Sequence, residues 1–100
     1  MIKYAILATI EARPGKEEAV AEFLKGARTI VQDESHTINW YAFRTGKSTF
    51  AIFDTFNDEA GRDGHLNGAA AQRLMAATEE LFVRPPIIEK ADLVAYTTPK

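Results

Sequence analysis

The chain has 100 residues, a formal net charge of -2 and no cysteine. This length predicts a single domain over residues 1–100, the charge gives no electrostatic reason to bind nucleic acid, and the lack of cysteine excludes disulfides and thiolate sites. No apolar stretch is long enough to span a membrane, and residues 1–4 do not begin a secretory signal. The sequence therefore predicts a cytoplasmic protein that binds neither nucleic acid nor membrane.

Strand-like and helix-like patterns alternate along the chain. Residues 4–12 alternate between two faces, as in a strand, whereas residues 16–32 carry apolar side chains at helical spacing. The expected elements, in chain order, are a strand at 4–12, a helix at 16–32, strands at 37–45 and 49–56, a short helix at 59–63, a helix at 69–82 and a strand at 87–96. A break at residues 64–68, flanked by glycine, is expected between the last two helices.

The order β-α-β-β-α-β predicts a ferredoxin-like α+β fold, with a four-stranded antiparallel sheet and the helices on one face. The first three expected strands carry apolar residues on both faces. Because the helices can cover only one face, the other would expose a large apolar patch, which usually marks an interface. We therefore expect a homodimer through the sheet face, forming a dimeric α/β barrel.

The two histidines are the first candidates for chemistry, because imidazole titrates near neutrality. His65 lies in the expected break, where a neutral ring at a cleft mouth could take a proton from a phenol or enol as general base. The alternative is a loop residue that caps or packs against the neighbouring helix. His36 follows the first helix, where a cationic ring would simply complement the helix dipole.

Aromatic and amide side chains on the second strand are candidates for substrate contact. Asn39, Tyr41 and Phe43 are predicted on one face, and Trp40 and Arg44 on the other. Asn39 and Tyr41 could act in catalysis, while Trp40 and Phe43 could bind a flat aromatic substrate. The alternative is that Trp40 and Phe43 are packing residues, one against the helices and one against a partner.

Asp54 is a carboxylate in the middle of the third strand. It is expected either at a solvated edge or paired with Arg44 or Arg62, and burial would perturb its pKa. Phe53, Asp54 and Arg62 complete the predicted substrate-binding set. Two histidines without a nearby pattern of paired carboxylates predict no metal site, and no phosphate-cradling loop is present to predict a nucleotide cofactor.

Five segments together resemble the antibiotic biosynthesis monooxygenase superfamily of small dimeric α/β-barrel proteins, in its quinol monooxygenase branch. The segments are EARPGK at 11–16, TINWYA at 37–42, STFAIFDTF at 48–56, DEAGRDGHL at 58–66 and PPIIEK at 85–90. The resemblance runs nearly from end to end. It implies a ferredoxin-like dimer that oxygenates phenols or quinols without flavin, haem or metal, since the substrate itself supplies the electrons.

The resemblance also bears on individual residues. Asn39, Trp40, Tyr41 and His65 are the nearest chemical equivalents of the groups that bind and deprotonate the aromatic substrate in characterised members. The haem-degrading members carry an Asn on the first strand and a Trp after the third, where this chain has Ala8-Thr9 and Phe56. These departures argue against haem cleavage. The alternative function is a non-catalytic dimeric module that binds a small ligand or stabilises an assembly.

Overall fold

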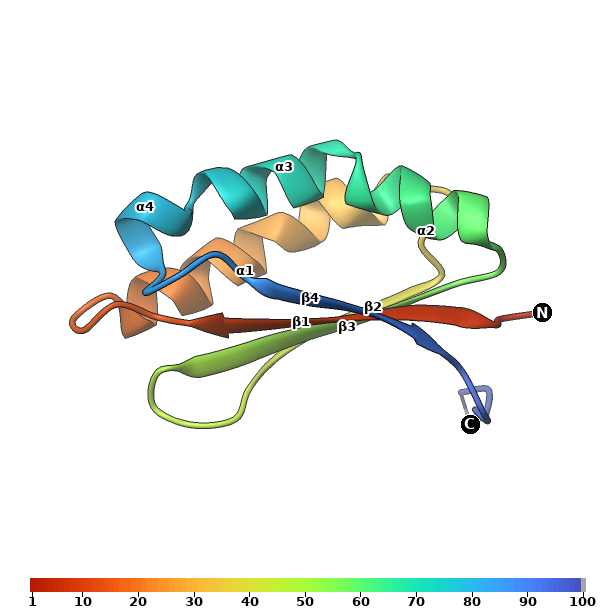
Figure 1. Cartoon of the computed structure of the whole chain (residues 1–100), viewed down its shortest axis with the longest axis horizontal. Coiled ribbons are helices and arrows are strands. Elements are labelled where there is room, and N and C mark those ends of the chain that lie inside the picture. Colours follow the sequence, from red (N-terminus) through yellow and green to blue (C-terminus); the bar gives the residue numbers. More distant parts are fainter. Residues whose placement is uncertain (100) are drawn as a thin grey trace.

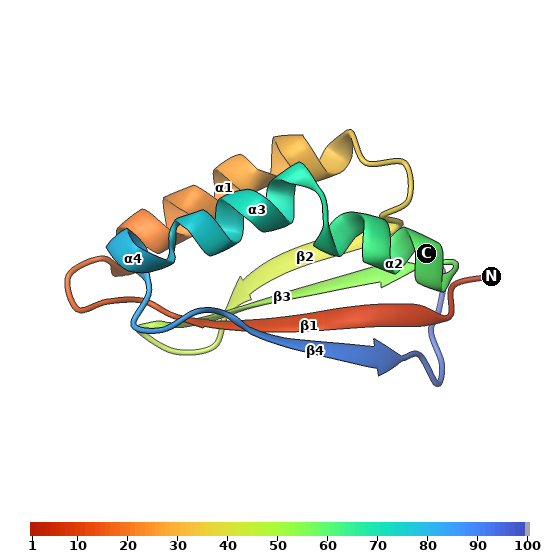
Figure 2. The ribbon, with the colours of Figure 1, turned by 45° about the horizontal axis from the view of Figure 1, so that its top comes forward.

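The computed structural model describes residues 1–99, and it has the expected α+β ferredoxin-like architecture (Figure 1). Its elements are β1 (Tyr4–Glu11), α1 (Glu17–Gln32), β2 (Asn39–Arg44), β3 (Thr49–Phe56), α2 (Glu59–Leu66), α3 (Ala69–Ala76), α4 (Thr78–Leu81) and β4 (Ile87–Asp92). The strands form one antiparallel sheet in the order β2-β3-β1-β4, beneath the helices (Figure 2). None of the helices in residues 1–99 combines the length and apolar character needed to cross a bilayer.

The core lies between the helices and the sheet face that they cover. Alternation along β1 turns Ile6 and Ile10 toward the helices, where both are buried. On α1 the helical spacing buries Val20, Leu24 and Val31 against the sheet. Burial of these side chains supplies most of the driving force for the fold.

The break between the second and third helices differs from the prediction. Helix α2 continues to Leu66, so Gly64 and His65 are helical, and the chain turns only at Asn67 and Gly68. The Asp58 side chain accepts a hydrogen bond of 2.7 Å from the N–H of Gly61 and so caps the N-terminus of this helix. A residue other than glycine at position 61 would also crowd the chain, because its Cβ would lie 3.3 Å from Cβ of His36.

Two other element boundaries differ from the prediction. The helix expected at 69–82 is interrupted at Ala77, which separates α3 from α4. The last strand ends at Asp92 rather than at residue 96, because Asp92 pairs with Tyr4, the first residue of β1. Beyond this pair the N–H of Leu93 donates to the carbonyl of Lys3, and then the chain leaves the sheet.

The second face of the sheet has no helix over it within residues 1–99 (Figure 1). Tyr41, Phe53 and Leu7 lie side by side across this open face in the strand register. Tyr41 is 57% exposed and Phe43 is 46% exposed. A groove of about 640 Å³ runs here between the sheet and residues 93–99.

Candidate active site

A buried histidine bound by two carboxylates lies between the sheet and the helices. Nε2 of His65 is 2.8 Å from Oδ2 of Asp54, and Nδ1 is 2.6 Å from Oε1 of Glu34. The hydroxyl of Thr37 donates a 2.7 Å hydrogen bond to the same Glu34 oxygen. We call Glu34, Thr37, Asp54 and His65 the His65 cluster.

Three separate parts of the chain build the His65 cluster. Asp54 shares the helix-facing side of the sheet with Ile6 and Trp40, its register partners on the neighbouring strands. His65 lies in the last turn of α2, and Glu34 lies in the loop after α1. All three ionisable side chains are nearly inaccessible, with exposed fractions of 2% for Asp54, 9% for His65 and 12% for Glu34.

Each nitrogen of the His65 ring faces a carboxylate oxygen, so a doubly protonated ring donates to both Asp54 and Glu34. Burial alone would lower the pKa of His65, but the hydrogen bonds and charges of Asp54 and Glu34 outweigh it and raise the pKa above its ordinary value. A second imidazole approaches the same site, since Nε2 of His36 lies 3.7 Å from Oε1 of Glu34.

Asp54 and His65 also line a cavity of about 40 Å³ whose other walls are mainly apolar. Oδ1 of Asp54 is buried and has no hydrogen-bond partner among residues 1–99. Leaving a buried acceptor unpaired costs about 1–3 kcal/mol. A water needs about 10–15 Å³ of such space, so the cavity is large enough for a water-sized group beside Asp54 and His65.

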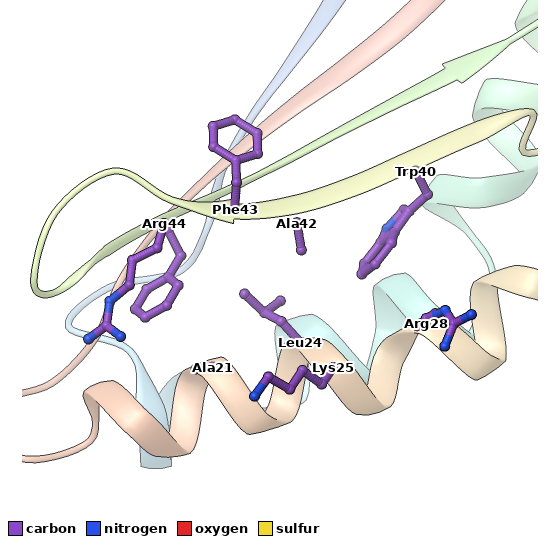
Figure 3. Close-up of a pocket in the computed structure, with 9 residues that line it drawn as sticks. Ala21, Leu24, Lys25, Arg28, Trp40, Ala42, Phe43 and Arg44 are labelled. Atoms are coloured by element: carbon purple, nitrogen blue, oxygen red, sulfur yellow. The ribbon is translucent and has the colours of Figure 1, made fainter. Parts of the chain in front are cut away.

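Trp40 and Leu24 line both this interior cavity and a larger hollow of about 300 Å³ between α1 and β2. We call this hollow the α1–β2 cleft; it is lined by Ala21, Leu24, Lys25, Arg28, Trp40, Ala42, Phe43, Arg44 and Phe50. Figure 3 shows Trp40 and Ala42 pointing toward α1, whereas the ring of Phe43 points away from it.

Comparison with solved structures decides the family. The chain is 47% identical to the NE2512 protein of unknown function from Nitrosomonas europaea, with a TM-score of 0.96, over 100% of this chain and 97% of that one. The chain belongs to the family of this protein. No protein-family model matches the chain, and neither does any curated protein.

More distant structures share the fold of the NE2512 family. Rv0793 from Mycobacterium tuberculosis is 16% identical, with a TM-score of 0.83, over 96% of this chain and 99% of that one. An antibiotic biosynthesis monooxygenase is 15% identical, with a TM-score of 0.78, over 92% of this chain and 99% of its own. At these identities the likeness extends to the fold alone.

In this member of the NE2512 family, the predicted site residues fall into two groups on opposite faces of the sheet. His65, Asp54 and Trp40 come together at the interior cavity. The others that lie on strands project from the open face; they are Asn39, Tyr41, Phe43 and Phe53. The structure therefore does not bring Tyr41 or Asn39 near His65.

Arg62 and Asn39 have structural partners. The Arg62 guanidinium donates to the carbonyl of Ala91 at 3.0 Å, and it lies over the Tyr4 ring at 5.0 Å from the centroid. The side-chain oxygen Oδ1 of Asn39 accepts a 2.9 Å hydrogen bond from the hydroxyl of Thr55. These contacts hold strands and helix together, away from the interior cavity.

The prediction that Asp54 pairs with Arg44 or Arg62 is wrong, because Asp54 pairs with His65 instead. Arg44 pairs instead with Glu18 at 3.0 Å. Glu34 and Thr37 were missed by the sequence prediction, although Glu34 lies only two residues before His36 in a polar loop. No local pattern marks Glu34, since its contact with His65 joins residues 31 positions apart.

Proposed function

We propose that the chain is a cofactor-independent monooxygenase that oxidises a small phenol or quinol with dioxygen. The observation that carries this proposal is the buried, unpartnered Oδ1 of Asp54 in a mainly apolar cavity. A structural ion pair gains nothing from an unpaired acceptor, whereas a proton acceptor needs one. The fold shared with an antibiotic biosynthesis monooxygenase supports the same reaction class.

In this mechanism the substrate hydroxyl donates its proton to Oδ1 of Asp54. The transfer takes place where the mainly apolar walls of the cavity keep bulk water away. His65 holds the carboxylate in place through its other oxygen, and Glu34 holds His65. The aromatic anion reduces dioxygen: a C–O bond forms at a ring C–H carbon, and the proton held by Asp54 completes a hydroperoxide there. The ring carbon then loses its C–H proton while the O–O bond breaks, and the outer oxygen leaves as water, so that one phenol and one dioxygen give one quinone and one water.

This mechanism changes the role predicted for His65. A histidine that acts as a general base must have one ring nitrogen free to accept a proton. Both ring nitrogens of His65 already face carboxylates. We therefore assign proton acceptance to Asp54, and to His65 the positioning of that carboxylate. Asn39 and Tyr41 contact no residue of this machinery and belong to the open face of the sheet.

We also propose that the protein acts as a homodimer through the open sheet face. Tyr41 and Phe43 are about half exposed there, beside the half-buried Phe53. A second copy related by a two-fold axis would bury the same side chains on both protomers. In such a dimer both interior cavities lie on the outer sides of the paired sheets.

Oxygen uptake with a panel of quinols and anthrones tests the enzymatic proposal. Asp54→Asn keeps the shape of the side chain but removes the proton acceptor, so turnover should fall by about 10²–10⁴-fold. Asp63→Asn is the matched control, because Asp63 is an exposed carboxylate 3.7 Å from Lys90. Full turnover by Asp54→Asn would refute the role of Asp54. Absence of oxygen uptake with every compound, together with binding of the aromatic, would favour the non-catalytic ligand-binding module.

A further inference from the structure

The α1–β2 cleft combines apolar walls with a row of cationic side chains. Leu24, Trp40 and Phe50 supply apolar surface inside it. Lys25 and Arg28 on α1 and Arg44 on β2 also line the cleft (Figure 3). Within residues 1–99 no acidic side chain lines it, although Glu22 and Glu18 pair with Lys25 and Arg44. The cleft is therefore apolar within and positively charged around its rim, in a protein whose net charge is -2.

We propose that this cleft binds a planar aromatic carboxylate, with its ring beside Trp40 and its carboxylate against Arg28 and Lys25. The inference rests on the proposed function in one respect, namely that the ring beside Trp40 belongs to the substrate. It adds that the substrate carries an acidic group at the end remote from Asp54. The volume of about 300 Å³ lies at the lower end of the range for small-ligand pockets.

Arg28 is the group best placed to receive the carboxylate. Arg44 already pairs with Glu18 at 3.0 Å, and Lys25 lies 3.5 Å from Glu22. Within residues 1–99 no carboxylate pairs with Arg28. Its planar guanidinium matches a carboxylate through two parallel hydrogen bonds, which a lysine ammonium cannot offer.

The charge distribution also orients the ligand. The carboxylates of Asp54 and Glu34 lie inside the protein, whereas the cations Lys25, Arg28 and Arg44 line the cleft. An aromatic acid would be repelled from the interior by its carboxylate end and attracted to the rim by the same group. A second copy of the chain fits this place poorly, because a two-fold contact through the cleft would set the same cations against one another.

Trp40 provides a direct readout, because it is the only tryptophan in the sequence. Its indole N–H gives one resolved side-chain signal in a ¹⁵N correlation spectrum of the full chain. The probes are 2-naphthoate and 2-naphthamide, which share shape and ring but differ in charge. Titration with 2-naphthoate should shift the indole signal in a saturable way, and 2-naphthamide should bind about fivefold more weakly or worse, the scale of one exposed ion pair.

Variants separate the rim charges from a general effect of net charge. Lys25→Ala combined with Arg28→Ala should reduce the affinity for 2-naphthoate to that for 2-naphthamide and leave the amide unaffected. The control is Arg13→Ala with Lys16→Ala, which removes two exposed cations that do not line the cleft and should preserve the preference. Raising the salt concentration should weaken the carboxylate alone.

Three results would overturn the inference. They are an indole signal that neither probe moves, equal affinity for the two probes, and an equal loss in the control variant. The naphthalene probes need not be oxidised for any of these measurements. Failure of binding therefore counts against the aromatic acid, whereas failure of oxygen uptake with quinols counts against the proposed function alone.

Discussion

Asp54 on β3 and His65 on α2 form a buried ion pair, with Nε2 of the ring 2.8 Å from Oδ2 of the carboxylate. This pair joins the sheet to the helical layer beside the interior cavity. Removing one partner of a buried pair typically costs about 3–5 kcal/mol, because the remaining charge is left without compensation. The pair is therefore a structural link as well as the centre of the proposed chemistry, and each role has its own test.

The stability of the protein should depend on pH through His65. Its folded-state pKa is raised, while in the unfolded chain it is about 6.5. The stabilisation is therefore complete below about pH 6.5 and is lost progressively as pH rises through the folded-state pKa. Urea unfolding at a series of pH values from about pH 6.5 upward should show a falling free energy of unfolding. His65→Gln should flatten that slope, and an unchanged slope would contradict the assignment.

Glu34 should contribute to the raised pKa of His65. Glu34→Gln removes a charged acceptor 2.6 Å from Nδ1, so the pKa of His65 should move downward. An NMR titration of the ring carbon-bound protons measures this directly. Glu22→Gln is the matched control, since Glu22 is an exposed residue of α1 that contacts Lys25. Identical titration curves in the wild type and Glu34→Gln would show that Asp54 alone sets the pKa.

Self-association should depend on the open sheet face. Tyr41→Glu places a charge on this face and should convert a dimer to a monomer, because an unpaired charge buried at an interface costs about 3–5 kcal/mol. Met75→Glu is the control, since Met75 is similarly exposed but lies on α3. Sedimentation velocity distinguishes the species. A wild-type monomer at micromolar concentration would refute the dimer.

Asp58 should stabilise the start of α2. Asp58→Ala removes the acceptor of the 2.7 Å bond from the N–H of Gly61, so the free energy of unfolding should fall by about 0.5–2 kcal/mol. Asp63→Ala, at an exposed position in the same helix, should change it by less than about 0.5 kcal/mol. Equal losses in the two variants would mean that the cap contributes nothing specific.

The element order and the face of each strand residue could be predicted because both depend on local periodicity. Alternation predicted that Ile6 and Leu7 lie on opposite faces, and the structure turns Ile6 toward the helices and Leu7 to the open face. The break expected at residues 64–68 is confined to Asn67 and Gly68, since a glycine such as Gly64 weakens a helix by only about 1 kcal/mol. The cap at Asp58 and the packing of α2 against His36 outweigh that amount.

The candidate site was predicted less completely, because its decisive contacts are tertiary. Asp54 and His65 were both identified as candidates, but nothing in their spacing shows that they meet. Glu34 comes from a third segment whose path is set by the packing of α1. The same limit explains why Asn39 and Tyr41 were grouped with His65, although the strand pattern already placed them opposite Trp40.

The alternation along β2 has a consequence for how such a protein can diverge. Trp40, Ala42 and Arg44 border the α1–β2 cleft, whereas Asn39 and Tyr41 face the opposite side. Substitutions at Trp40, Ala42 and Arg44 would therefore change the lining of the cleft, and those at Asn39 and Tyr41 would change the open face, whereas Phe43 borders both. Selection can act on these two sets of positions separately, so relatives could differ in the cleft while retaining the same open face.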